Sequence, residues 1–150
     1  MEVHMLLQAI LAAVLGTVAM TLSSTTEMHW RERQPSVVPG RAVLKLLGWA
    51  GLPELKDRGL QILSTWAHWA YGAVWGVAFW LLIDVAGLDL AAGAVAFFLL
   101  VWMTEQIQLP ALGLTPPSWR WGLRENLIDA WHHVVFASGT VAGWVLIGVA

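Results

Sequence analysis

The chain has 150 residues, of which 58% are hydrophobic and only 12% are charged, and its mean hydropathy is +0.66. Soluble domains are typically about 45–50% apolar and about 25% charged, so this composition points to a membrane protein. The eight lysine and arginine residues crowd mostly into one loop, which argues against a nucleic-acid-binding protein. Because the chain contains no cysteine, disulfides, thiolate metal sites and cysteine nucleophiles are excluded.

The first apolar run, residues 5–24, is just long enough to cross a membrane as a helix. Spanning about 30 Å of hydrocarbon takes roughly 20 helical residues. A secretory signal peptide is the competing interpretation, but no basic side chain precedes the run and a dense basic segment follows it. We therefore expect a retained transmembrane helix.

The next segment, residues 23–60, carries six of the eight basic residues, namely Arg31, Arg33, Arg41, Lys45, Lys56 and Arg58. Within it, residues 41–52 form an amphipathic stretch whose aliphatic side chains can face lipid while its basic side chains face headgroups. Such a stretch is predicted to lie along the membrane surface as a short interfacial helix. Pro39 and Gly40 are expected to prevent helix before it, and Pro53 is expected to end it.

Three further apolar runs, residues 61–85, 90–109 and 127–149, are each long enough to span a membrane. Gly87 marks a tight turn between the first two of these runs, and Pro110 is expected to end the second. The sequence therefore predicts an all-α membrane protein. It would form one four-transmembrane-helix bundle over the whole chain, with a short amphipathic interfacial helix in the first loop.

The basic residues also predict how the bundle is oriented. The first loop has six of them, the second none, and the third two, Arg120 and Arg124. Cytoplasmic loops carry the excess of lysine and arginine, so both termini should lie outside the cytoplasm. The chain is rich in tryptophan, with eleven, and indole rings favour the membrane–water boundary. The predicted inner-boundary anchors are Trp30, Trp66, Trp119 and Trp121.

Each predicted span carries ionisable residues near its cytoplasmic end: Glu27, His68, Glu105 and, in the last span, Asp129, His132 and His133. On every span these residues share a helix face with small residues, which mark the packing surfaces of membrane helices. On the first, second and fourth spans the small residues are the pairs Ala12 and Gly16, Gly72 and Gly76, and Gly139 and Gly143. On the third span that face is predicted to hold Ala91, Ala94, Phe98, Val101 and Glu105. Ionisable groups inside a membrane are costly and by default functional, so we expect them to point at one another across a shared interior.

A metal site is the sharpest hypothesis for this cluster. Asp129 and His132, three positions apart, resemble the acid-x-x-His ligand pairs of di-metal carboxylate bundles. The full predicted ligand set is Glu27, His68, Glu105, Asp129, His132 and His133. Such oxygen and nitrogen ligands suit iron, zinc or manganese, and would make the chain a membrane metalloenzyme or metal-binding protein.

Three alternatives remain open for the same residues. A b-type haem would take His68 together with His132 or His133 as cofactor-binding ligands. A proton or ion pathway would use the carboxylates and histidines as a relay, through an oligomer or as a regulated proton site, because the outer half offers few polar groups. A purely structural role would pair the cluster with loop arginines, namely Arg31, Arg33, Arg120 and Arg124.

A family resemblance rests on Gly16-Thr-Val-Ala-Met20, Glu27, Arg31, Arg33 and Pro35 at the first span, and on His68-Trp-Ala-Tyr71-Gly72 at the second. This pattern resembles the YagU-like uncharacterised bacterial inner-membrane proteins. The resemblance implies a small polytopic protein of a bacterial inner membrane and brings no established reaction. We therefore expect a proton- or ion-handling component or an accessory subunit, in a homo-oligomer or a larger membrane complex, and leave enzymatic activity open.

Overall fold

The computed structural model describes residues 2–48, 55 and 57–149, and these form helices without any strand. In chain order the elements are α1 (Glu2–Trp30), α2 (Val38–Gly48), α3 (Asp57–Trp80), the π-helical turn η1 (Leu81–Val85), α4 (Leu90–Ala111), the 3₁₀ turn η2 (Ser118–Arg120) and α5 (Leu123–Gly148). Four helices, α1, α3 continued by η1, α4 and α5, are long and apolar enough to span a membrane. The predicted all-α class with four candidate spans is confirmed.

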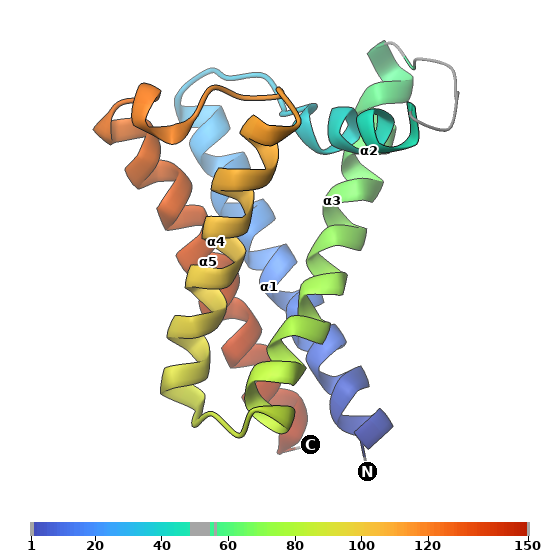
Figure 1. Ribbon diagram of the computed structural model, residues 1–150, viewed down its shortest axis with the longest axis vertical. Helices are drawn as coiled ribbons and strands as arrows, with labels where there is room; N and C mark the ends of the chain where they lie inside the picture. Colours follow the sequence, from blue (N-terminus) through green and yellow to red (C-terminus); the bar gives the residue numbers. More distant parts are fainter. Residues whose placement is uncertain (1, 49–54, 56, 150) are drawn as a thin grey trace.

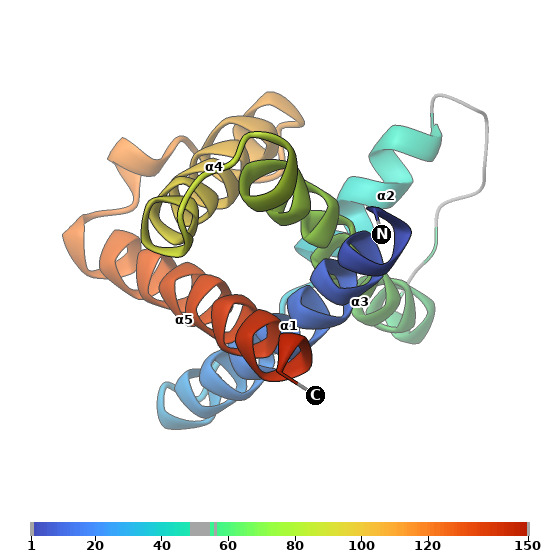
Figure 2. The same ribbon diagram turned by 90° about the horizontal axis from the view of Figure 1, so that it is seen from below.

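The four long helices run side by side, and the connections divide the bundle into two ends (Figure 1). Both termini and the turn between η1 and α4 lie at one end, which we call the terminal end. Segments 31–37 and 112–122 and helix α2 lie at the other, which we call the loop end. Seen along the bundle, α1, α5, α4 and α3 follow one another around its axis (Figure 2).

Helix α1 packs between α3 and α5 because glycines allow close approach of the backbones. A Cβ atom at Gly16 would overlap the hydroxyl of Thr140 on α5, and one at Gly72 on α3 would overlap the hydroxyl of Thr17. One at Gly76 would lie only 2.6 Å from the Cα of Ile10. Membrane helices associate through such small residues, so the predicted packing faces of these three helices are confirmed.

Aromatic rings fill the interior toward the terminal end. The rings of Phe79 and Phe97, both fully buried, have centroids 5.1 Å apart. Phe136 lies 5.6 Å from Phe97, and Trp144 lies 5.7 Å from Phe79, each by ring centroid. These rings join α3, α4 and α5 into one apolar core.

The interior face of α4 agrees only in part with the predicted one: Val101 is buried as expected, and Phe98 packs against the core. Gly93, Phe97 and Val101 are buried, whereas Ala91 is exposed. Residues 90–103 of α4 are apolar on every side, so the alanines among them do not mark which side faces the bundle. Aromatic rings such as that of Phe97 contact the neighbouring helices instead.

Helix α2 begins at Val38, three residues earlier than the predicted start at residue 41. Pro39 is tolerated because the first turn of a helix has no internal partner for its backbone N–H. The N–H of Gly40 donates to Ser64 Oγ at 3.0 Å, which fixes α2 against α3. The last four residues of the predicted stretch, 49–52, and Pro53 lie outside the described residues.

All four long helices extend further at the loop end than the apolar runs predicted, and α3 begins at Asp57 instead of residue 61. Helix α1 continues to Trp30, so Glu27 lies in its last turns, and α5 begins at Leu123, so Glu125 lies in its first turn. Helix α4 also continues through Pro110 to Ala111, one residue past the expected stop. These extensions carry polar side chains toward the same end of the bundle as segments 31–37 and 112–122.

Candidate acid–histidine site

Three of the six predicted site residues come together between α4 and α5. Glu105, Asp129 and His133 each offer a ligand atom within 4.8 Å of the other two. Nε2 of His133 lies 2.6 Å from Oε2 of Glu105, and the side chain of His133 is only 3% exposed. We call these three residues the triad.

The hydrogen bonds of His133 decide which of its nitrogens faces Glu105. Nδ1 lies 2.8 Å from the backbone carbonyl oxygen of Asp129, one helical turn earlier. A carbonyl oxygen only accepts, so Nδ1 carries a proton and donates it. Nε2 is therefore the atom directed at Glu105, and the ring is held in a fixed orientation.

The carboxylate of Asp129 is oriented by two donors from α4. Trp102 Nε1 donates to Oδ2 at 2.8 Å, and Gln106 Nε2 donates to the same oxygen at 2.7 Å. The other oxygen, Oδ1, lies 3.8 Å from Nδ1 of His133. Sequence reasoning did not assign Trp102 or Gln106 to the site, although their spacing of four residues places them on one face of α4.

Glu27 lies in a separate ion network rather than in the triad. Arg31 donates to Glu27 at 2.8 Å and, through two nitrogens, to Glu125 at 3.0 and 2.6 Å, and Arg33 contacts Glu27 as well. Hydrogen bonds to Glu125 and to Glu27 hold the pKa of the Arg31 guanidinium above its usual value. We call these four residues the ion network; it matches the structural alternative and ties the end of α1 to the start of α5.

His132 and His133 are neighbours in sequence but face different partners. Nδ1 of His132 lies 3.0 Å from Ser23 Oγ on α1. Its Nε2 lies 4.0 Å from Glu27, beyond hydrogen-bond distance, and is buried without a partner among the described residues. His132 therefore lies beside the ion network, and the structure brings His133, and not His132, together with Asp129 and Glu105.

His68 lies apart from both groups and binds α1. Its Nε2 is 3.1 Å from the hydroxyl of Thr21. That hydroxyl already donates to the carbonyl oxygen of Thr17 at 2.7 Å, so Nε2 of His68 must be the donor. Since the three histidines bind three different partners, this arrangement adds no support to the haem alternative.

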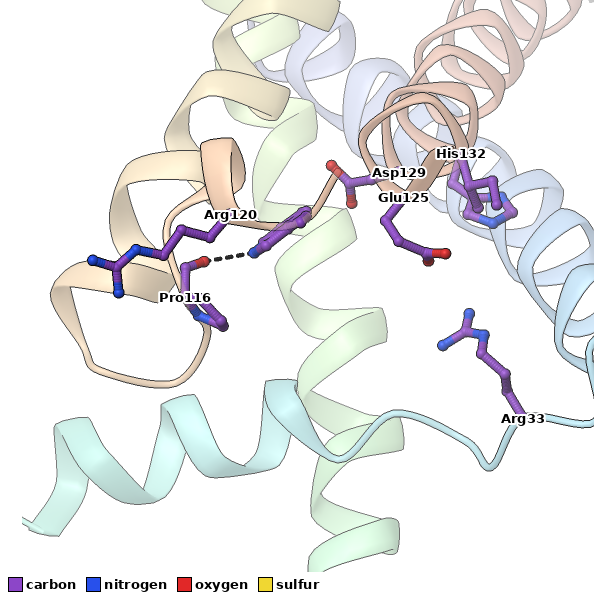
Figure 3. Close-up of a pocket in the computed structure, with 8 residues that line it drawn as sticks. Arg33, Pro116, Arg120, Glu125, Asp129 and His132 are labelled. Carbon is purple, nitrogen blue, oxygen red and sulfur yellow. Dashed lines mark hydrogen bonds between the residues drawn. The ribbon is translucent and has the colours of Figure 1, made fainter. Parts of the chain in front are cut away.

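An open pocket of about 440 Å³ lies at the loop end, and Asp129 contributes to its wall. The other lining residues are Arg33, Pro116, Arg120, Trp121, Glu125, Ile128 and His132. Figure 3 shows Arg33, Glu125 and His132 facing one another across it, while Arg120 extends away from them beyond Pro116. Asp129 is thus shared by the pocket and the triad.

Chemically, the triad combines one imidazole nitrogen with two carboxylates, a donor set suited to zinc, iron or manganese. Hydrogen-bond partners that orient each ligand, such as the Asp129 carbonyl for His133, are typical of metal-binding histidines. Within the described ranges no other group of three acids or histidines brings its ligand atoms this close. The same short contacts also suit proton exchange between Glu105 and His133.

Comparisons with protein-family models, with curated proteins and with solved structures find no match to this chain. The YagU-like resemblance therefore stays a prediction.

Proposed function

We propose that this chain is an ion-handling membrane protein whose triad binds a divalent metal ion such as zinc, iron or manganese. The observation that carries the proposal is the setting of His133. Its Nδ1 is bound to the Asp129 carbonyl at 2.8 Å, and its buried Nε2 is directed at a carboxylate 2.6 Å away. A metal ion and a proton would compete for that nitrogen, because a ligand must be deprotonated to bind metal.

The membrane setting of the proposal follows from the spans and the charges. The basic loops favour a cytoplasmic loop end with both termini outside. A bacterial inner membrane is what the YagU-like resemblance implies. Trp30, Trp66 and Trp119, all near the loop end, are 83%, 71% and 82% exposed, as expected of anchors at a membrane–water boundary. Helix α2, with Arg41 and Lys45 exposed, would lie along that boundary.

A second candidate function, an accessory subunit of a larger membrane assembly, is favoured by a groove between α3 and α4. The groove has a volume of about 650 Å³ and a mostly apolar lining that includes Val74, Leu81 and Ile107. The side chains of Val74 and Ile107 are exposed, so a helix from a partner or from a second copy could pack against them. Cross-linking in native membranes, followed by mass determination in detergent, tests this candidate.

The metal proposal is tested on protein purified in detergent and stripped with a chelator. Binding of Zn²⁺, Mn²⁺ and Fe²⁺ is then measured by calorimetry, and bound metal by elemental analysis after buffer exchange. We expect one ion per chain in the wild type. The double variant Glu105→Gln/Asp129→Asn should bind none, because both carboxylate ligands are lost.

The matched control is Glu27→Gln/Glu125→Gln, which removes the same number of carboxylates from the ion network. It should retain the metal, and helix content measured by circular dichroism should show that both double variants fold. Equal loss of metal in the two double variants, or no stoichiometric metal in the wild type, would contradict the proposal.

A further inference from the structure

We infer that the triad exchanges its ion with one side of the membrane only, through the pocket at the loop end. This inference rests on the proposed function for the identity of the ion, but its geometry stands apart from it. Asp129 supplies the link, because it lines the pocket and also belongs to the triad. An ion that reaches Asp129 from the pocket is therefore already at one ligand of the site.

The charges around the pocket favour the approach of a cation. Of the two arginines that line the pocket, Arg33 is paired with Glu27, and Arg120 extends away from Glu125 and His132 (Figure 3). Asp129 receives its bonds from the neutral donors Trp102 and Gln106, so its negative charge is not balanced by an arginine. The most buried charged side chain of the pocket wall, Asp129, is thus an acid.

In the opposite direction, toward the terminal end, α4 and α5 offer no ionisable side chain to an ion. From residue 134 to the end of α5, and from residue 90 to residue 104 on α4, the sequence contains no acid, histidine, lysine or arginine. The fully buried rings of Phe79 and Phe97 fill this part of the interior, and Phe136 is 3% exposed. Ions do not cross such an apolar layer without polar partners.

The two buried hydroxyls at mid-depth do not open a relay either. Thr17 donates to the carbonyl oxygen of Ala13 at 2.8 Å, and Thr140 donates to that of Phe136 at 2.9 Å. Each hydroxyl proton is committed to its own helix. A single copy of the chain would therefore bind and release an ion at one face, as a sensor or a buffer does, and would not carry it across.

The natural lack of cysteine makes the inference directly testable. Single-cysteine variants are reconstituted in liposomes and treated with a membrane-impermeant cationic methanethiosulfonate from one side at a time. Ser118→Cys marks the loop end and Ala86→Cys marks the terminal end. Ile128→Cys reports on the pocket, which it lines without belonging to the triad, and Ala137→Cys, 4% exposed, reports on the interior beyond it.

We expect Ile128→Cys to react with reagent added on the side that labels Ser118→Cys. Reagent added on the side that labels Ala86→Cys should not label it at all. Ala137→Cys should react from neither side. Reaction of Ile128→Cys from the Ala86 side, or of Ala137→Cys from that side, would overturn the inference. Transfer of Zn²⁺ across wild-type liposomes, detected with an enclosed zinc-sensitive dye, would overturn it too.

The two proposals fail in different ways. One-sided labelling without any stoichiometric metal would overturn the proposed function and support one-sided access. Stoichiometric metal with labelling from both sides would support the proposed function and overturn the access inference.

Discussion

Two groups of acids and histidines lie near the same end of the bundle, and they differ in what balances their charges. In the ion network every carboxylate is bonded to an arginine, and Arg31 serves two of them. In the triad the partners are an imidazole, an indole N–H and an amide N–H. A carboxylate held by arginine has its charge satisfied permanently, whereas one held by an imidazole can exchange a proton for a metal ion.

The two groups also differ in their place on the helices. The ion network joins the last turns of α1 to the first turn of α5. Its two arginines, Arg31 and Arg33, come from segment 31–37. The triad lies further along α5 and faces α4, and no ion pair joins it to those arginines among the described residues. Burial does not separate the two groups, since Glu27 of the ion network is 14% exposed and Glu105 of the triad is 29% exposed. The comparison predicts that ion binding belongs to the triad and stability to the ion network.

The adjacent histidines give the largest expected contrast between the two groups. His133→Gln removes the triad nitrogen, so the affinity for Zn²⁺ should fall by more than about 100-fold, beyond the loss typical of outer hydrogen-bond partners. His132→Gln alters the neighbouring position on the same helix and should leave the affinity nearly unchanged. Calorimetric titration of both variants measures the contrast. Equal losses would show that the two histidines act together, as the sequence first predicted.

The donors to Asp129 should have the next largest effect. Gln106→Leu and Trp102→Phe each remove one hydrogen bond to Oδ2, which lets the carboxylate turn away from His133. Loss of such an outer partner typically weakens metal binding about 10- to 100-fold. Tyr71→Phe is the control, since its hydroxyl bonds to Gln108 and not to the triad. Unchanged affinity in both donor variants would argue that Asp129 is not a ligand.

The comparison also shows how far sequence reasoning reaches. The four helices and the packing glycines follow from apolar length and from small-residue spacing, which are local properties of the chain. The interior face of α4 followed only in part: Val101 was expected there and is buried, but Gly93 and Phe97 were missed because residues 90–103 are apolar on every side. The site followed in part: the spacing of Asp129 and His132 predicted a pair, and the structure pairs Asp129 with His133.

The division of the six residues into separate groups depended on distances between helices. Glu27 and Arg31 are four residues apart, so their ion pair could be predicted from the sequence, because residues at this spacing are neighbours on a helix. The second bond of Arg31, to Glu125, spans 94 positions and needed the fold. The same holds for His68, whose partner Thr21 lies 47 positions away. Sequence alone placed these groups at one depth but could not assign their partners.

Acidification should weaken metal binding at the triad in a graded way. Metal binding at Nε2 of His133 displaces a proton, so affinity should fall as the pH is lowered. The expected decrease is about tenfold per pH unit for each proton displaced. Titrations between about pH 8 and about pH 6 measure the slope, and buffers of different ionisation enthalpy count the protons released. An affinity independent of pH would mean that the ion does not bind the imidazole.

The smallest expected effect is on stability and belongs to the ion network. Glu27→Gln removes the bonds to Arg31 and Arg33 and should lower the free energy of unfolding by about 1 kcal/mol, the upper range for ion pairs near a surface. Glu125→Gln should cost less, because Glu125 is 43% exposed while Glu27 is 14% exposed and is held by two arginines. Denaturant titration in detergent measures both, with metal affinity followed in parallel. If Glu27→Gln instead abolished metal binding at unchanged stability, the carboxylate of Glu27 would have to reach the ion, and the separation of the two groups would be wrong.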